Sequence, residues 1–469
     1  MLIETHPMRK IKRVHFVGIG GVGMCGIAEV LLNLGYEVSG SDVKENSAIK
    51  RLREQGARVF IGQAESNVEQ VEVVVVSTAI PADNVEVVGA KKHRIPVIRR
   101  AEMLAEIMRF RHGIAIAGTH GKTTTTSLAA SILIEAGLDP TYVIGGKLNS
   151  AASNAKLGSG KYFVAEADES DASFLLLQPM LAVVTNIDAD HLETHDGDFE
   201  KYKHSFIEFL HHLPFYGKAI ICLDDPVNQE ILSDISRPVI TYGIESDADI
   251  RAIDIKCNGM QCHYQLLLPQ MDEGIEITLN MPGRHNVLNS LAAISVAHLL
   301  GVNTESMQKA LQVFDGIGRR MQQYGEIVTP KGNVLLVDDY AHHPTEIKAT
   351  LEAAKNAWSE RRIVVVFQPH RYTRTRDLFE DFSKVLSAAD TLIITEVYAA
   401  GEEHIAGADG RALCAAIRAR GRVNPVFVEE ISELNASIAD VIEKADVILT
   451  LGAGSIGTIA KKLPEALAK

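Results

Sequence analysis

The chain has few cysteines, and they do not form a recognisable pattern. There are five among 469 residues, an odd and scattered set, so we expect a reducing compartment and no disulfide framework. Cys257 and Cys262 are close in sequence, but no second pair of Cys or His residues has zinc spacing. Ordinary packing of both thiols is therefore favoured over a metal site.

Positive charge and long apolar runs are also lacking. Lys and Arg total 47 against 60 Asp and Glu, a formal net charge of -13, which argues against a nucleic-acid partner because phosphate backbones select clustered Lys and Arg. No apolar segment reaches the ~20 residues of a membrane span, and residues 1–13 contain no signal-peptide core. We therefore expect a cytoplasmic protein without membrane insertion.

The rest of the composition is typical of a folded protein of several domains. Hydrophobic residues make up 46% and charged residues 23%, which is too apolar for disorder. A chain of 469 residues is longer than one hydrophobic core usually supports. Short apolar segments alternate with helical patterns, which predicts parallel sheets wrapped by helices in three domains, residues 1–112, 113–318 and 319–469. The main expected strands are 13–18, 37–39, 71–77, 97–98, 114–117, 162–165, 181–186, 219–223, 334–337, 363–367, 391–395, 426–427 and 447–451, with antiparallel segments near 250–268.

A glycine-rich turn follows the first strand. Gly18, Gly20, Gly21 and Gly23 match G-x-G-x-x-G, and Asp42 lies nineteen residues after the last glycine, where a ribose-binding acid is expected. Such glycines let the backbone approach a diphosphate at a helix N-terminus. A nicotinamide-dependent dehydrogenase and a purely structural tight turn remain alternatives at this point.

A second phosphate-binding pattern follows the strand at 114–117. The segment G-T-H-G-K-T has the core of a P-loop, but Ile116 breaks the full Walker spacing. Backbone N–H groups can still hold phosphates, Lys122 can reach the outer phosphates, and the Thr123 hydroxyl can bind magnesium. A pyridine-nucleotide enzyme has no use for this loop. The candidate ATP-binding residues here are Gly118, Thr119, His120, Gly121, Lys122, Thr123 and Thr124.

With this loop and several later motifs, nearly the whole chain resembles the Mur ligase family. The further motifs are E-A-D-E-S-D at 166–171, Asp190-His191, P-G-R-H-N-V-L-N at 282–289, Arg319-Arg320, D-D-Y-A-H-H-P-T at 338–345 and Q-P-H-R-Y-T-R-T at 368–375. The resemblance implies an α/β protein with a Rossmann-like N-terminal domain that binds a UDP-sugar substrate, a central P-loop ATPase-like domain, and a Rossmann-like C-terminal domain that binds an amino acid. It also implies ATP and Mg²⁺ as cofactors.

Within the family, the G-G-V-G-M opening and the segments 338–345 and 368–375 are most similar to members that add L-alanine to UDP-N-acetylmuramate in peptidoglycan biosynthesis. The related murein-peptide ligases share much of this pattern. The implied reaction transfers the ATP γ-phosphoryl group to the lactyl carboxylate. The amine of L-alanine then attacks the acyl phosphate, and UDP-N-acetylmuramoyl-L-alanine, ADP and phosphate result.

The resemblance also implies roles for particular residues. Lys122 and Arg320 are expected to neutralise the transferring phosphoryl group. Magnesium is expected on Thr123 and Glu166, with Glu169 as an alternative carboxylate ligand, and His191 is expected near a second magnesium ion. A carbamylated lysine found in several members is not assigned, because neither Lys201 nor Lys203 has clear spacing. Expected nucleotide contacts are His285, Asn286, Asn289 and Asp339, and expected substrate contacts are Gly18, Gly20, Gly21, Gly23, Asp42, His343, Arg371 and Arg374.

Arg371 and Arg374 are three residues apart, so both can face one carboxylate if the segment is helical. Ion pairs with the acidic segment 377–381 are the alternative. His342 is a further candidate for this pocket, and Gly452 to Ser455 offer another backbone anion site. We expect a monomer or weak homodimer. A nicotinamide-dependent oxidoreductase and a non-catalytic nucleotide sensor are the competing hypotheses from other classes.

Overall fold

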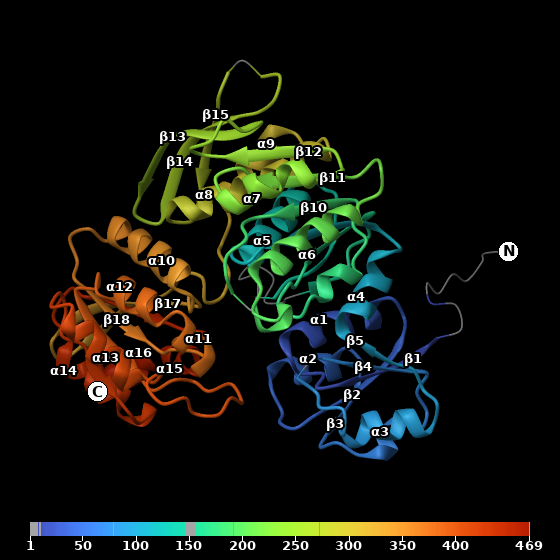
Figure 1. Cartoon of the computed structure of the whole chain (residues 1–469), viewed down its shortest axis with the longest axis horizontal. Helices are drawn as coiled ribbons and strands as arrows, with labels where there is room; N and C mark the ends of the chain where they lie inside the picture. The colour runs from blue at the N-terminus through green and yellow to red at the C-terminus, as the bar shows by residue number, and fades with distance from the viewer. Residues whose placement is uncertain are drawn as a thin grey trace. The chain divides into compact units, whose positions relative to one another are not determined.

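The structure is a computed structural model that describes residues 8, 11–77, 79–145, 155–190, 192–271 and 273–468. These residues form three sheets with flanking helices (Figure 1). The chain divides into two compact units, each described by itself below. Unit 1 comprises Met1–Ile253, Gln265–Ile277 and Leu288–Asp315, and unit 2 comprises Asp254–Tyr264, Thr278–Val287 and Gly316–Lys469.

The first sheet has five parallel strands in the order β3-β2-β1-β4-β5. The order reverses between β1 and β4, which is the switch point of a Rossmann-like sheet, and the glycine turn leaves β1 there. This confirms the predicted N-terminal fold, although β3 was not foreseen. Its elements are β1 (Arg13–Val17), α1 (Val22–Asn33), β2 (Glu37–Asp42), α2 (Ser47–Glu54), β3 (Arg58–Ile61), β4 (Val73–Val76), α3 (Val85–Lys92), β5 (Val97–Arg99) and α4 (Arg100–Met108).

The second sheet has ten strands in the order β15-β14-β13-β12-β11-β10-β6-β9-β7-β8. Strand β6 (His112–Ala117) is buried after its first residue and lies parallel to both β9 (Tyr162–Glu166) and β10 (Leu181–Val184). This explains its continuous apolar sequence, which a strand covered on both faces requires. One hydrophobic core runs through the first sheet and this parallel region. The remaining elements are α5 (Lys122–Glu135), β7 (Thr141–Val143), β8 (Ala155–Lys156), α6 (Phe199–His211), β11 (Lys218–Cys222), α7 (Pro226–Ile231), β12 (Val239–Gly243), β13 (Ile250–Asn258), β14 (Gln261–Leu267), β15 (Ile275–Leu279), α8 (Arg284–Leu299) and α9 (Thr304–Gln312).

The third sheet, in unit 2, has the order β16-β17-β21-β18-β19-β20. Its strands are parallel except β16 (Gln322–Thr329), which pairs antiparallel with β17 (Gly332–Asp339). Separate hydrophobic clusters cover its two faces. The sequence did not predict β16, because this edge strand is largely exposed and lacks an apolar run. The other elements are α10 (Pro344–Ala357), β18 (Ile363–Phe367), α11 (Tyr372–Asp377), α12 (Phe379–Leu386), β19 (Thr391–Thr395), α13 (Gly410–Ala419), β20 (Val426–Val428), α14 (Leu434–Val441), β21 (Val447–Leu451), α15 (Ile456–Ala460) and α16 (Leu463–Leu467).

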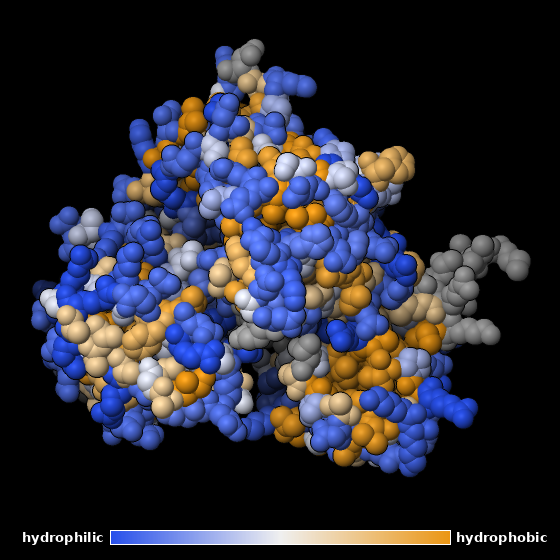
Figure 2. All heavy atoms as spheres, in the orientation of Figure 1, coloured by the Kyte–Doolittle hydropathy of each residue, from blue (hydrophilic) through white to orange (hydrophobic). Residues whose placement is uncertain are grey.

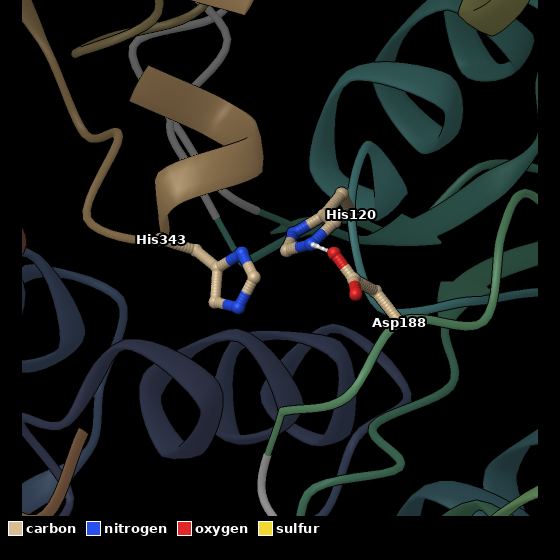
Figure 3. A group of neighbouring side chains, drawn as sticks. All are labelled: His120, Asp188 and His343. Carbon is tan, nitrogen blue, oxygen red and sulfur yellow. Dashed lines mark hydrogen bonds and ion pairs between the residues drawn. The ribbon is translucent and has the colours of Figure 1, made fainter. Parts of the chain in front are cut away.

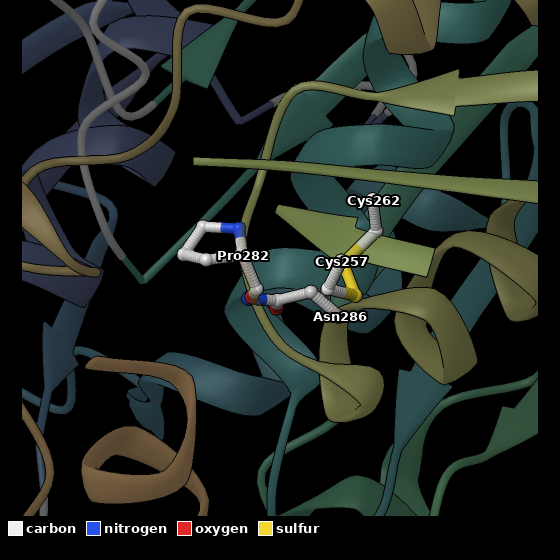
Figure 4. Close-up of a disulfide and its surroundings, with 4 residues drawn as sticks. All are labelled: Cys257, Cys262, Pro282 and Asn286. Atoms are coloured by element: carbon white, nitrogen blue, oxygen red, sulfur yellow. A yellow bond between two sulfur atoms is a disulfide. The ribbon is translucent and has the colours of Figure 1, made fainter. Parts of the chain in front are cut away.

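One expectation about the cysteines is wrong. Cys257 and Cys262 form a disulfide, with their Cα atoms 4.0 Å apart (Figure 4). Strands β13 and β14 are neighbours joined by Gly259 and Met260 alone, so they form a hairpin that places the two cysteines opposite each other. The side chain of Met260 packs against the hydrophobic core of unit 2, which anchors the turn. The other cysteines, Cys25, Cys222 and Cys414, are buried thiols.

The surface mixes polar and apolar residues, as Figure 2 shows for one face. On this face, apolar side chains gather at the lower right, over the first sheet (Figure 1 and Figure 2). Among the helices of the described residues, none has the length and apolar character needed to cross a membrane.

Candidate active site

The phosphate loop lies between β6 and α5, as the sequence predicts. Gly118 has φ 123° and Gly121 has φ 85°, both in the left-handed region that favours glycine. A Cβ atom on Gly118 would collide with the Thr185 hydroxyl, and one on Gly121 would collide with the Asn289 side-chain oxygen. Both glycines are therefore required by close approach as well as by backbone conformation.

Thr185 and Asn186, which directly follow β10, hold the phosphate loop through hydrogen bonds. The backbone N–H of His120 donates to Asn186 Oδ1 at 2.8 Å, and the Thr119 N–H donates to the Asn186 carbonyl at 3.0 Å. The Thr185 hydroxyl donates to the His120 carbonyl at 2.6 Å. Because Asn186 already engages these two amides, the N–H groups of the first turn of α5 are the ones that can face an anion. Thr124 is a buried member of that turn.

Asp188 fixes the side chains of the same loop. Its Oδ2 lies 3.0 Å from His120 Nε2, and its backbone N–H donates to Thr119 Oγ1 at 2.9 Å (Figure 3). The Thr119 hydroxyl also lies 3.1 Å from the hydroxyl of Tyr202, which is buried on α6. The side chains of Thr119 and His120 are therefore oriented by neighbouring groups.

Lys122 forms an ion pair with Glu169. Its Nζ lies 2.8 Å from Glu169 Oε1, and the Glu169 side chain is 2% exposed. Burial raises the pKa of Glu169 to about 7, in spite of the Lys122 charge. Burial opposes the charge on Lys122, but Glu169, Asp168 and Glu166 together raise the pKa of this lysine. In this structure the partner of the Glu169 carboxylate is therefore the Lys122 ammonium.

Thr123 and Glu166 lie in direct contact. The Thr123 hydroxyl donates to Glu166 Oε2 at 3.2 Å, and the Gly145 N–H donates to Glu166 Oε1 at 2.6 Å. Two of the three predicted magnesium ligands are therefore brought together at the end of β9 and the start of α5. The third, His191, lies outside the described residues.

The two lysines considered for carbamylation form ion pairs. Lys201 pairs with Asp196, and Lys203 pairs with Glu200 and Glu230.

The glycine turn after β1 is held by Asp42. The Gly20 N–H donates to Asp42 Oδ2 at 2.9 Å, and Asn46 Nδ2 donates to the Gly20 carbonyl at 3.1 Å. A Cβ on Gly20 would lie 2.6 Å from Asn46 Nδ2 and 2.8 Å from Asp42 Oδ2, so a larger residue here would displace both side chains. The carboxylate that the sequence predicts as a ribose ligand therefore also supports the turn.

Next to this turn is a cavity of about 530 Å³, lined by Ser77, Ile80, Lys91 and Arg99 among others. A Cβ on Gly18 would touch Ile80 at 3.4 Å. The cavity is thus adjacent to the glycine turn and carries two cationic side chains.

An ion pair links the first sheet to the phosphate-loop region. Arg100, at the start of α4, contacts Asp168 Oδ2 at 3.1 Å. Burial favours the neutral form of Asp168, but Arg100 and Lys122 outweigh it and lower the pKa of this carboxyl. Gly23 lies against the Arg100 side chain, because a Cβ atom on Gly23 would lie 3.1 Å from Arg100 Cδ. The glycine turn and the phosphate loop are therefore connected within unit 1.

The element predicted to contact adenine is divided between the two units. In unit 2, Asn286 Nδ2 donates to the Pro282 carbonyl at 2.8 Å, and burial together with Arg320 lowers the pKa of His285 to about 4. In unit 1, Asn289 Oδ1 accepts a hydrogen bond from the Thr125 hydroxyl at 3.3 Å. Asn289 therefore lies beside the phosphate loop.

Two arginines near the start of the segment Gly316–Lys469 of unit 2 lie close to the ring of Tyr340. The guanidinium of Arg320 lies 5.3 Å from the Tyr340 ring centre and that of Arg319 lies 5.0 Å from it, while Arg319 also pairs with Asp338 at 2.9 Å. Asp339 is buried and accepts the Met321 N–H at 2.7 Å. Burial raises the pKa of Asp339 to about 6, against the opposing charge of Arg320.

The second histidine of the H-H-P-T motif caps α10. His343 Nδ1 accepts the Thr345 N–H at 3.4 Å, and His342 Nδ1 lies 3.2 Å from Glu346 Oε2. Both histidines are therefore oriented by the start of this helix.

Arg371 is the N-cap residue of α11, with φ 70°, and Arg374 lies in the first turn of that helix. Arg371 pairs with Glu402, whose Oε1 lies 3.6 Å from the guanidinium, and Glu402 lies outside the acidic segment 377–381. Arg374 is buried, and its guanidinium lies 3.4 Å from His370 Nδ1. Burial, with the positive charges of His342 and both arginines, lowers the pKa of His370 to about 3.

The turn from Gly452 to Ser455 is held by the side chain of Gln368. This side chain forms hydrogen bonds with Ser455 Oγ and with the Ile456 N–H.

Sequence reasoning missed Asn186, Asp188 and Arg100. A signal for the first two was available, because T-N-x-D directly follows an apolar strand and the carboxyl ends of parallel strands carry binding residues. Nothing local distinguishes Arg100 from other surface arginines.

Comparisons with known proteins cover almost the whole chain. Residues 13–112 match the Mur ligase family catalytic domain, 116–297 the Mur ligase middle domain, and 319–454 the Mur ligase glutamate ligase domain. A UDP-N-acetylmuramate–L-alanine ligase of Methylococcus capsulatus is 59% identical over 467 residues, covering 100% of this chain and 99% of that protein.

Two solved structures are similar over their full length. A UDP-N-acetylmuramate-alanine ligase of Thermotoga maritima is 29% identical with a TM-score of 0.81, covering 97% of this chain and 98% of that one. A murein peptide ligase of Psychrobacter arcticus is 25% identical with a TM-score of 0.72, covering 98% and 99%.

Proposed function

The chain belongs to the Mur ligase family, and from this premise we propose that it joins L-alanine to the lactyl carboxylate of UDP-N-acetylmuramate while ATP is converted to ADP and phosphate. The observation that carries the proposal is the 59% identity, over the full chain, to a protein named for this reaction. The product is UDP-N-acetylmuramoyl-L-alanine, a precursor of peptidoglycan. ATP as a co-substrate favours the cytoplasm as the place of the reaction.

ATP is assigned to unit 1. The loop from Gly118 to Thr124 presents first-turn amides and the Lys122 ammonium, which suits a chain of phosphates. Thr123 and Glu166 offer a hydroxyl and a carboxylate in contact with each other, which are the oxygen donors that Mg²⁺ prefers. Mg²⁺ bound there would neutralise phosphate charge, and His191 would hold a second ion.

The transfer step requires positioning and charge neutralisation more than covalent help from the protein. The lactyl carboxylate oxygen attacks the γ-phosphorus, and ADP leaves. Lys122 neutralises the phosphoryl oxygens, and we assign the same role to Arg320 from unit 2. The amine of L-alanine then attacks the acyl carbon, and phosphate leaves from the tetrahedral intermediate.

The two substrates are assigned to the remaining sites. The glycine turn and the adjoining cavity, with Lys91 and Arg99 in its lining, suit the diphosphate and uridine of the sugar nucleotide. Asp42 contributes by holding Gly20 in place. Arg371 and Arg374 suit the α-carboxylate of L-alanine, because a guanidinium can bind a carboxylate through two parallel hydrogen bonds. His285, Asn286, Asn289, Asp339 and His343 remain proposed ligand contacts.

One assay separates this proposal from its rivals. The purified chain is incubated with UDP-N-acetylmuramate, ATP, Mg²⁺ and either L-alanine or the tripeptide L-alanyl-γ-D-glutamyl-meso-diaminopimelate, and phosphate release and product mass are followed. We expect phosphate and product with L-alanine. Product only with the tripeptide would indicate a murein-peptide ligase. If no phosphate is released, calorimetric titrations with NADH and with ATP separate the other two hypotheses: NADH binding would indicate an oxidoreductase, and ATP binding would indicate a sensor.

A further inference from the structure

Lys122 uses all three of its N–H donors inside the protein. An ammonium group has three donors and no acceptor. Nζ lies 2.6 Å from the Gly118 carbonyl, 2.9 Å from the Thr119 carbonyl and 2.8 Å from Glu169 Oε1. A phosphate oxygen can therefore bind Lys122 only when one of these contacts is released.

Releasing Glu169 is the least favourable choice. The residue is 1% exposed, and among the described residues its Oε2 atom has no hydrogen-bond donor. A buried carboxylate that loses its cation is destabilised far more than a backbone carbonyl that loses one hydrogen bond. The contacts to Gly118 and Thr119 are accordingly the ones to exchange for phosphate.

The three carboxylates of this region have different partners. Glu166 accepts from Thr123 and Gly145, and Asp168 accepts from Arg100 and Ser170, while Glu169 reaches Lys122. The backbone around Glu169 is fixed as well. Ala167 N–H donates to Ile116 of β6 at 2.9 Å, and Ala172 N–H donates to the Glu169 carbonyl at 3.0 Å. The position of Glu169 relative to the phosphate loop is therefore set by the sheet.

We propose that Glu169 is a positioning residue that holds the Lys122 ammonium at the phosphate loop, both in the free enzyme and with ATP bound, while the carbonyl contacts of that ammonium exchange for phosphate oxygens. This inference rests on the proposed ATP site. It assigns Glu169 to the lysine and leaves Glu166, which contacts Thr123, as the carboxylate for Mg²⁺. The 47-residue separation of the pair in sequence means that the sheet, not the loop alone, aims the lysine.

The test compares Glu169→Gln, Glu169→Asp and the matched variant Glu166→Gln in the full chain. For each, kcat and the KM for ATP are measured at saturating Mg²⁺ and substrates, and the Mg²⁺ midpoint at saturating ATP. We expect Glu169→Gln to lower kcat at least tenfold and raise the KM for ATP severalfold, with the Mg²⁺ midpoint within twofold of wild type. Glu169→Asp, which keeps the charge, should retain more activity. Glu166→Gln should raise the Mg²⁺ midpoint at least tenfold.

Other outcomes overturn the proposal. A tenfold rise of the Mg²⁺ midpoint in Glu169→Gln would make Glu169 a metal ligand, and a lower Tm with unchanged kinetics would make its role structural. Calorimetric titration with a non-hydrolysable ATP analogue and Mg²⁺ provides a readout that does not need turnover. Weaker binding to Glu169→Gln is expected, whereas tighter binding would show that Glu169 competes with phosphate. If wild type makes no product, the proposed function fails, yet this titration still decides the role of Glu169. If Glu169→Gln does not fold, Glu169→Asp is titrated instead, with the same two criteria.

Discussion

At the scale of single residues, Lys122 carries the largest expected effect on activity. Lys122→Ala removes the ammonium that neutralises the transferring phosphoryl group, so we expect kcat to fall at least about 100-fold. The protein should still fold, because the backbone of the phosphate loop is also held by hydrogen bonds to Asn186. Phosphate release reports the activity, and circular dichroism with thermal unfolding reports the fold.

The matched control for this variant is Lys309→Ala. Lys309 lies on α9 of the same unit, is 63% exposed and pairs with Glu135 at 2.6 Å. Its removal should leave turnover within about twofold, because exposed ion pairs contribute little. Turnover close to wild type in Lys122→Ala would exclude this loop as the ATP site.

A second residue, His370, gives a pH dependence of stability. Burial, followed by the positive charges of His342, Arg374 and Arg371, lowers its pKa to about 3, while the unfolded value is about 6.5. Because the folded pKa is the lower one, its stabilising contribution is present above about pH 6.5 and is lost as the pH falls toward about 3. His370→Gln cannot take up this proton, so its Tm should fall less than that of wild type between pH 7 and pH 5.

Calorimetry at the two pH values measures this difference. His204→Gln, which changes an exposed histidine on α6, serves as the control and should behave like wild type. Equal losses of Tm in His370→Gln and wild type would contradict the assignment of the acid sensitivity to His370.

At the scale of elements, the sequence predicted the strands and turns that are determined locally. The apolar run before G-T-H-G-K-T identified β6, and the loop and α5 follow where expected. Contacts between distant elements were not predictable, because neither member carries a local signal. Lys122 and Glu169 are 47 residues apart, and Thr125 and Asn289 are 164 residues apart. Only the folded arrangement of the elements that carry them brings each pair together.

The β13–β14 hairpin shows the reverse case, a local feature that was misjudged. Cys257 and Cys262 flank a short turn, and Gly259, with φ 56°, is the kind of turn residue that predicts a hairpin. The count and scatter of the cysteines concealed this pairing. Spacing about a predicted turn would have been the more informative criterion.

The hairpin disulfide leads to a prediction for reduction. Treatment with a dithiol should lower the free energy of unfolding by about 2 kcal/mol at most, because the closed loop is short. Urea unfolding measures this change, and alkylation followed by mass spectrometry should label two more cysteines after reduction. A double variant, Cys257→Ser with Cys262→Ser, should not respond to the dithiol. Alkylation of both cysteines in unreduced native protein would contradict the disulfide.

At the scale of the whole molecule, the residues assigned to one reaction are divided between the two units. Lys122, with the sugar-nucleotide turn, belongs to unit 1, while Arg320 and Arg371 belong to unit 2. Gly316, with φ 79°, begins the long segment of unit 2, and such a residue can absorb backbone rotation. The acyl phosphate must also be protected from water until the amine attacks, and domain closure is the usual means.

We therefore expect ATP and UDP-N-acetylmuramate together to shift the population toward a more compact form. Each ligand alone contacts only part of the assigned site, so the differential binding energy that drives closure should appear when both are present. Small-angle scattering with a non-hydrolysable ATP analogue, Mg²⁺ and the sugar nucleotide measures the radius of gyration, which should fall beyond the error of replicate curves. Single-ligand samples and Lys122→Ala with both ligands are the controls, and both should change less. An unchanged radius from the free to the doubly bound enzyme would mean that the residues of unit 2 act without domain closure.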